Sequence, residues 1–185
     1  MSSSKIPQLV LKSSSNQCEI PVIAFGTAAV TNNDGEITKV AVIEAIKSGY
    51  RHFDTALIYG SEEALGEAIA EALQLGLIQS RDELFITSMV YVSKIYAIKH
   101  RNLKLEYLDL YLIHFPITVK PGNWEMPYAE ELITTFDLKG VWTAMEECQK
   151  LGFAKSIGVS NFTRKKLDDL LSFAIIPPSV NQVRQ

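Results

Sequence analysis

The chain is predicted to fold as an α/β domain built on a parallel sheet. Short apolar, β-rich segments alternate along it with amphipathic helical patterns, joined by short links. This alternation is typical of repeated strand–helix–strand units. Several strand segments are continuously apolar, as strands buried on both faces are. The expected strands lie at residues 22–26, 52–54, 84–88, 108–113, 156–160 and 179–182.

The length of the chain decides which parallel fold is expected. A (β/α)8 barrel typically needs about 250 residues, whereas this chain has 185. The pattern therefore predicts an incomplete (β/α)8 barrel with about six of the eight parallel strands. We expect a single domain over 1–185 whose C-terminal part is missing. A doubly wound sheet of six strands fits the same pattern.

A β-hairpin is expected before the first strand of the sheet, because residues 8–11 and 18–20 flank a short polar, Ser-rich segment. Four helices are expected as well. The clearest begins after Ser61, a residue type suited to cap a helix N-terminus, and ends at Gly76. The others lie around 40–46, 138–148 and 167–174, the last two after Asp137 and Thr163.

The composition excludes several classes of partner. With a net charge of -3, the chain lacks the basic excess of a nucleic-acid-binding protein. It contains no apolar run close to the roughly 20 residues of a membrane helix, and its first residues do not resemble a secretory signal. Cys18 and Cys148 form neither a disulfide framework nor a metal-ligand spacing. We expect a cytosolic protein without a metal, a membrane or a nucleic acid as partner.

Polar residues gather where the predicted strands end, and in barrels functional side chains lie at the C-terminal ends of strands. Taken singly, each also has a structural interpretation: a strand-end Asp forms turns, and Ser-Asn before a helix caps it. The strand ends carry Gly26, Thr27, Asp54, Ser88, Met89, His114, Ser160, Asn161 and Gln182.

Four segments, in order along the chain, resemble the signatures of the aldo-keto reductase family: 49–66, 108–116, 156–162 and 180–183. The resemblance covers nearly the whole chain and breaks sharply between Met89 and about His100. Residues 71–77 and 144–152 are most similar to the plant branch, which includes codeinone reductase and the reductase acting with chalcone synthase. The break itself favours an altered exon junction over gradual divergence.

The resemblance implies that the protein reduces an aldehyde or ketone to an alcohol with NADPH, acts on a small molecule and is mostly monomeric. It implies that Tyr59 is the general acid that protonates the substrate oxygen. His114 would bind the substrate and polarise its carbonyl. Asp54 would hold a catalytic lysine and contact the nicotinamide ribose.

The resemblance also implies a cofactor site. Ser160, Asn161 and Gln182 would bind the nicotinamide carboxamide, and Thr27, next to Gly26, would lie by the ribose. Trp124 falls in the long loop after the fourth strand, which in this family borders the substrate, so we expect it to line the substrate pocket.

The lysine of the family is replaced here by Met89, directly after Ser88. A thioether carries no charge and donates no proton. An unpaired Asp54 near Tyr59 would disfavour ionisation of the phenol, and losing positioned acid catalysis typically costs about 10²–10⁴-fold in rate. No spacing argument brings Lys94 to the same place. We therefore expect impaired catalysis.

The family also continues beyond Gln182 with two more strands and a basic segment that binds the 2′-phosphate of NADPH. Neither follows Gln185, and Arg184 stands where an acidic residue is usual. From this we expect weak or absent NADPH affinity, and open edges on the first and sixth strands.

Two other functions fit parts of the sequence. One is a non-catalytic remnant of the family that acts by pairing its open barrel edges with another chain. The other is a barrel metal-hydrolase that uses His52, Asp54 and His114. The sequence gives the metal-hydrolase hypothesis little support, because it contains no His-x-His pair. His52 is more simply explained as packing inside the barrel.

Overall fold

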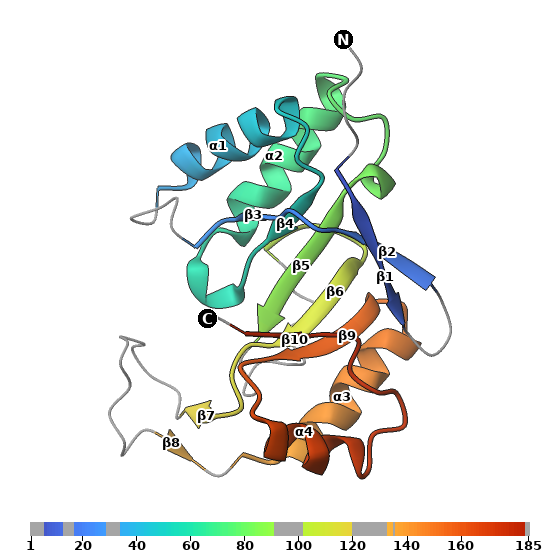
Figure 1. Ribbon diagram of the computed structural model, residues 1–185. Helices are drawn as coiled ribbons and strands as arrows, with labels where there is room; N and C mark the ends of the chain where they lie inside the picture. The colour runs from blue at the N-terminus through green and yellow to red at the C-terminus, as the bar shows by residue number, and fades with distance from the viewer. Residues whose placement is uncertain are drawn as a thin grey trace.

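The centre of the fold is a parallel sheet of six strands (Figure 1). The structure is a computed structural model, and it describes residues 6–12, 17–28, 34–90, 102–119, 133–134 and 136–183. The sheet has the order β10-β9-β6-β5-β4-β3. Its strands are β3 (Phe25–Gly26), β4 (His52–Asp54), β5 (Phe85–Val90), β6 (Leu108–Ile113), β9 (Ala154–Ser160) and β10 (Asn181–Gln182).

The order of the strands distinguishes the two folds that the sequence left open. The six strands lie side by side in the sheet in the same order as in the sequence, and each neighbouring pair is parallel. A doubly wound sheet would reverse its order at a switch point, and this sheet does not. The arrangement is that of a barrel wall, so the incomplete (β/α)8 barrel is confirmed and the doubly wound alternative is wrong.

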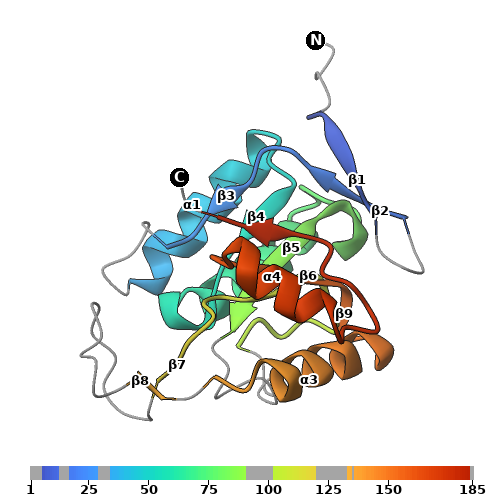
Figure 2. The ribbon, with the colours of Figure 1, turned by 60° about the horizontal axis from the view of Figure 1, so that its bottom comes forward.

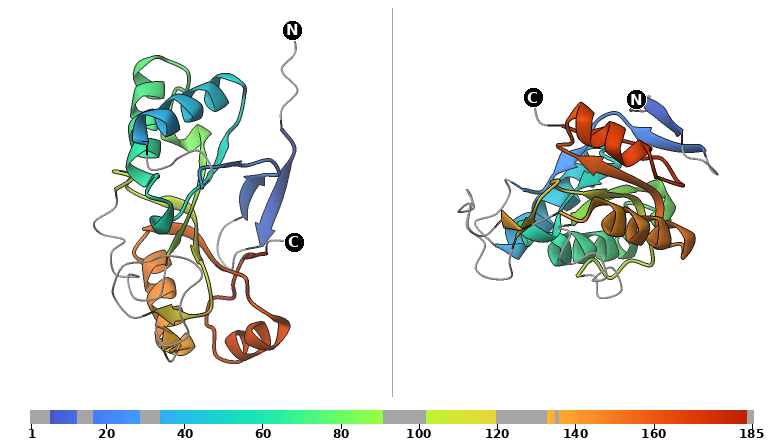
Figure 3. Two further views of the ribbon diagram at one scale, coloured as in Figure 1. Left: turned by 90° about the vertical axis from the view of Figure 1, so that its left-hand side faces the viewer. Right: turned by 90° about the horizontal axis from the view of Figure 1, so that it is seen from below.

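The predicted hairpin is present as β1 (Gln8–Lys12) and β2 (Gln17–Pro21), which pair antiparallel. It lies on the other side of the sheet from α1 (Gly35–Lys47), α2 (Glu62–Gln74) and α3 (Leu138–Lys150) (Figure 3). Leu11, Cys18 and Ile20 of the hairpin pack against apolar residues on the inner face of the sheet. The hairpin therefore covers part of the barrel interior.

Two apolar clusters hold the sheet, one on each face. The outer cluster lies between the strands and the helices and includes the fully buried Trp142. The inner one contains Phe85, Met89, Leu110 and Leu112. Phe85 and Met89 of β5 join the inner cluster and Ile86 and Val90 join the outer one, which is why the strand is buried on both faces.

Helix starts follow the expected capping chemistry with one exception. The side chains of Asp137 and Thr163 cap α3 and α4 (Arg164–Leu171), and Asp34 caps α1. Ser61 stands at the N-cap position of α2, as predicted, but its side chain makes no capping hydrogen bond. No helix among the described residues is long and apolar enough to cross a bilayer.

Several element bounds differ from the expectation. The strands β3 and β10 have two residues each, shorter than expected, because each lies at an edge of the sheet and pairs with only one neighbour in the described part of the chain. The helix α4 ends at Leu171 instead of continuing to 174. A small antiparallel pair, β7 (Thr118–Val119) and β8 (Ile133–Thr134), lies in the long loop and was not predicted.

Gly66 of α2 lies against the backbone of Leu103 and gives a test of the packing. A Cβ at this position of α2 would overlap the backbone carbonyl of the buried Leu103. We expect Gly66→Ala to lower the free energy of unfolding by about 1–3 kcal/mol, as overpacking does, although alanine favours a helix. Gly35→Ala is the control, since its Cβ would make an ordinary contact. Equal stability of the two variants in chemical denaturation would contradict this packing.

Candidate active site

Four of the polar residues predicted at the strand ends, Asp54, His114, Asn161 and Gln182, meet at one end of the sheet. Ser88 does not join them, because it lies within β5 and its Oγ donates to Glu62 Oε1 of α2. Three hydrogen bonds connect the site residues across different strands. Gln182 Nε2 donates to Asp54 Oδ2 at 3.1 Å, Asn161 Nδ2 donates to the carbonyl of His114 at 3.0 Å, and Tyr59 Oη lies 3.3 Å from His114 Nε2. The parallel register brings these residues together although up to 128 positions separate them in sequence. Figure 2 shows the final strand, in red, drawn across the sheet in front of the β4 label.

Tyr59 and His114 form the centre of the site. Their rings meet edge to face, with centroids 5.5 Å apart, and His114 stacks on Phe115. Tyr59 lies in the 3-10 helix η1 (Leu57–Tyr59), between β4 and α2. Burial lowers the pKa of His114 to about 4, so its imidazole is neutral at neutral pH. A phenol beside a neutral imidazole can donate a proton to, or share a hydrogen bond with, a third polar atom.

Asp54 lies at the end of β4 with an amide as its partner. Burial raises the pKa of its carboxyl to about 6, and the hydrogen bond from Gln182 opposes that shift. Among the described residues, no cation forms an ion pair with this carboxylate. The group therefore remains partly protonated near pH 6, where an exposed aspartate would be fully ionised.

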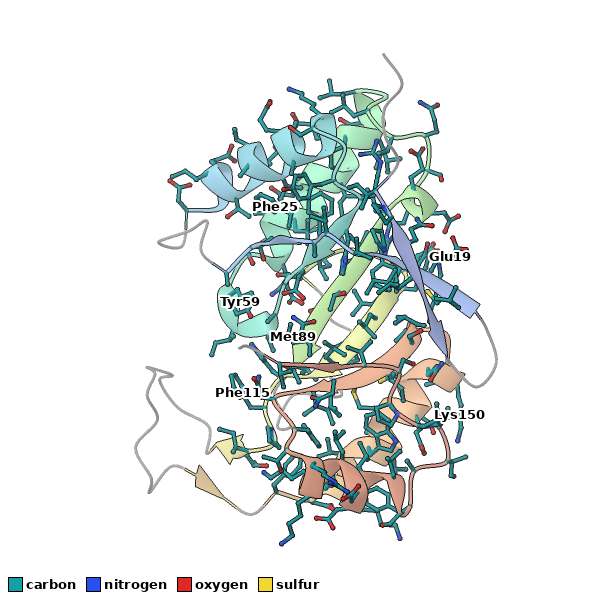
Figure 4. The ribbon with its side chains drawn as sticks, viewed as in Figure 1. Glu19, Phe25, Tyr59, Met89, Phe115 and Lys150 are labelled. Carbon is teal, nitrogen blue, oxygen red and sulfur yellow. The ribbon has the colours of Figure 1, made fainter. Side chains whose placement is uncertain are left out.

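Met89 occupies the inner face of β5, at the position where the sequence resemblance implies a lysine. Its side chain is 3% exposed and belongs to the inner apolar cluster, against which Tyr59 and Ile58 pack. Figure 4 shows Met89 close to Tyr59 at the same end of the sheet. The thioether supplies packing area there but neither a charge nor a proton.

Ser160, Asn161 and Gln182 form a polar corner where β9 and β10 end. Ser160 Oγ donates to the carbonyl of Gln182 at 2.7 Å, and Asn161 Nδ2 donates to Ser160 Oγ at 2.9 Å. Asn161 has a left-handed backbone with φ of 61°, a conformation that asparagine tolerates better than most residues. This turn directs its amide across the strand ends toward His114. The corner thus presents amide groups, which suit a ligand with both donors and acceptors.

Thr27 lies at the end of β3, as predicted, but its hydroxyl is turned into the protein. The residue is fully buried, and its Oγ1 contacts Ser61 Oγ at 2.7 Å and the carbonyl of Asp54 at 3.2 Å. Gly26 beside it is exposed. The sequence did not predict the hydrogen bond between Thr27 and Ser61, because a serine before a helix is expected to cap it. It also did not predict the hydrogen bond between Gln182 and Asp54.

His52 is buried inside the barrel, where its ring makes two hydrogen bonds. Its ring nitrogens bond to Thr87 Oγ1 at 2.9 Å and to the carbonyl of Pro21 at 3.1 Å, which confirms the packing interpretation. Burial lowers its pKa. Within the described ranges, no group of three or more His, Cys, Asp or Glu side chains is placed to hold a metal ion. Trp124, proposed at the substrate pocket, and Lys94 both lie outside the described residues.

Comparison with known proteins identifies the family. The model of the aldo/keto reductase family matches residues 22–185, which include every strand of the large sheet. The chain belongs to the aldo/keto reductase family. A solved member, a Bombyx mori aldo-keto reductase in complex with NADP, has a TM-score of 0.83 and 36% sequence identity. That match covers 99% of this chain and 59% of the Bombyx mori chain.

Curated plant members of the aldo/keto reductase family are more similar in sequence. NADPH-dependent codeinone reductase 1-4 from Papaver somniferum is 52% identical over 191 residues, covering 99% of this chain. NAD(P)H-dependent 6'-deoxychalcone synthase from Glycine max is 51% identical and D-galacturonate reductase from Fragaria ananassa 50% identical, each covering 97% of this chain. The chain spans 59% of the length of each of these relatives.

The raised pKa of Asp54 predicts a pH dependence of stability. Its folded pKa of about 6 exceeds the ordinary 3.8, so the stabilisation from the protonated form is complete below 3.8 and is lost as pH rises through about 6. The free energy of unfolding should therefore fall, relative to Asp54→Asn, as pH rises across this window. The comparison with Asp54→Asn cancels the opposite contribution of His114, whose pKa is lowered.

Chemical denaturation of both proteins across this pH range measures the difference. Asp137→Asn, at an exposed helix cap that asparagine also satisfies, is the control for the loss of one negative charge. A difference between wild type and Asp54→Asn that does not change with pH would contradict the burial of this carboxyl.

Proposed function

We propose that this chain is an NADPH-dependent reductase of small aldehydes or ketones whose turnover is limited by Met89. The observation that carries the proposal is the contact of Tyr59 with a neutral His114 at the C-terminal end of a barrel wall. The names of the relatives support the cofactor, since codeinone reductase is NADPH-dependent and the Bombyx mori structure contains NADP.

The residues at the ends of β9 and β10 fit a nicotinamide carboxamide by their chemistry. A primary amide needs an acceptor for its NH2 group and a donor for its oxygen. In the described part of the chain, no hydrogen bond engages Oδ1 of Asn161 or Oε1 of Gln182, so both are available as acceptors. Gln182 Nε2 can donate when it leaves Asp54. Gly26, which has no side chain, leaves open space at the neighbouring strand end.

In the proposed reaction the protein supplies a proton and holds the substrate oxygen in position. NADPH, when bound, supplies the hydride that reduces the carbonyl carbon. Tyr59 donates the proton to the carbonyl oxygen, and His114, neutral at working pH, orients that oxygen through Nε2. A carbonyl oxygen near both atoms would take hydrogen bonds from both. Asp54 would contact the cofactor ribose.

Met89 explains why we expect slow turnover. A phenol has an ordinary pKa near 10 and gives up its proton more readily when a cation lies beside it. Here the neighbouring side chain is an apolar thioether, and the carboxylate of Asp54 is held by an amide. Neither group stabilises the phenolate that forms when Tyr59 donates its proton.

Met89→Lys tests this explanation directly. The substitution should raise the rate of NADPH-dependent carbonyl reduction by about 10²-fold or more, the typical contribution of a positioned acid. The measurement is NADPH oxidation, followed by absorbance, with a panel of aromatic aldehydes and ketones. Met89→Gln, of similar length but uncharged, is the control. Equal rates for the lysine and glutamine variants, both folded and both binding NADPH, would contradict the proposal.

A second candidate function is chain–chain pairing without catalysis. One observation favours it: β3 and β10 are edge strands of the described sheet, and exposed Val22, Ile23 and Val183 flank them. An unpaired apolar edge is a template for another strand. Sedimentation should then reveal a concentration-dependent dimer, weakened by Ile23→Lys. A monomer at all concentrations would exclude this function.

A further inference from the structure

Three buried hydroxyl groups form a connected, hydrogen-bonded chain at the ends of the segment that carries Tyr59. Thr27 and Thr55 are 0% exposed and Ser61 is 1% exposed. Ser61 Oγ lies 2.7 Å from Thr27 Oγ1 and 3.0 Å from Thr55 Oγ1. Thr27 Oγ1 donates in turn to the backbone carbonyl of Asp54 at 3.2 Å. The chain therefore links the ends of β3 and β4 to the start of α2.

The number of available protons determines which hydroxyl donates in each of these hydrogen bonds. Each hydroxyl carries one proton, and Thr27 donates its proton to the carbonyl of Asp54. The contact with Thr27 must then use the proton of Ser61, and the contact with Ser61 must use that of Thr55. Ser61 is the only member that must accept from one hydroxyl and donate to another. A side chain without a hydroxyl cannot replace it.

The contact between Thr55 and Ser61 closes the segment that carries Tyr59. These two residues flank residues 56–60, and their hydroxyls join its two ends. Thr55 N also donates to the carbonyl of Thr87 on β5, which anchors one end of the segment to the sheet. Gly60, with φ of 66°, makes the left-handed turn that follows Tyr59. The position of the phenol therefore depends on how these ends are held.

Ser61 does not make the capping hydrogen bond that its position before α2 favours. A serine at the N-cap normally accepts a hydrogen bond from a backbone N–H of the first helical turn. Ser61 makes no such bond, and its hydroxyl is used within the buried chain instead. The local capping preference is thus overridden by contacts with Thr27 and Thr55.

We propose that Ser61, with Thr55 and Thr27, is a positioning residue for Tyr59: the hydroxyl chain holds the phenol beside His114. The inference deepens the proposed function and rests on the role given there to Tyr59 as proton donor. Loss of the central hydroxyl releases the segment from the strand ends, so the phenol no longer keeps its distance from His114.

The test is fluorine NMR of the full chain labelled with 3-fluorotyrosine, with the Tyr59 signal assigned by its absence in Tyr59→Phe. Ser61→Ala should shift or broaden that signal and lower kcat about tenfold, since small displacements of reacting groups are costly. The affinity for NADPH, from a fluorescence titration, should stay unchanged. Ser61→Thr, which keeps a hydroxyl, should restore both the signal and kcat.

A matched control separates positioning from general destabilisation. Thr38→Val removes a buried hydroxyl of α1, away from the site, which within the described residues donates only to the carbonyl of Asp34. It should lower the melting temperature without moving the Tyr59 signal. If Ser61→Ala does not fold, Thr55→Val, which is isosteric, breaks the Thr55–Ser61 contact and is read in the same way.

The outcomes distinguish this inference from the proposed function. An unchanged Tyr59 signal in Ser61→Ala, or an equal change in Thr38→Val, overturns the positioning role whatever the activity. A shifted signal that Ser61→Thr restores supports it, even if the wild-type chain shows no turnover. In that last case the proposed function alone fails.

Discussion

The site depends on the parallel register of the sheet. Ordered pairing aligns Asp54 with Thr87, Ile113 with Val159, and Ser160 with Gln182. Both faces of these strands are covered, so polar side chains within them, such as His52 and Thr87, bond to one another, and side chains that can reach a ligand lie where the strands end. The same register then brings those ends to one edge, where the phenol of Tyr59, the neutral imidazole of His114 and a set of amides meet.

Burial also determines how each group in this edge behaves. It keeps His114 neutral and raises the pKa of Asp54, and both effects arise from low solvation and not from neighbouring charges. A buried carboxylate is costly without a cation, and here Gln182 is the partner that the described chain offers. Met89 leaves this pair, and the phenol next to it, without a positive charge. This lack of a positive charge is the reason for the proposal that Met89 limits turnover.

Much of this could be predicted from the sequence because the signals were local. Apolar runs gave the central strands β4 and β6 with their bounds, and Asp137 and Thr163 gave helix starts. The edge strands were predicted too long because their length depends on neighbours that a sequence pattern does not reveal. The hydroxyl chain through Ser61 and the bond between Gln182 and Asp54 join residues far apart in sequence, so no local rule predicts them. The resemblance to a family supplied the candidate site residues, but it could not show which hydrogen-bond partners they have.

In the proposed function, the ends of β9 and β10 bind the nicotinamide end of the cofactor. The most direct measurement is a titration of the ¹⁵N-labelled chain with NADP⁺, followed by amide chemical shifts, since it detects even millimolar affinity. We expect saturable shifts centred on Ser160, Asn161 and Gln182, with smaller ones near Asp54. Saturable shifts elsewhere in the chain, or none at millimolar NADP⁺, would contradict it.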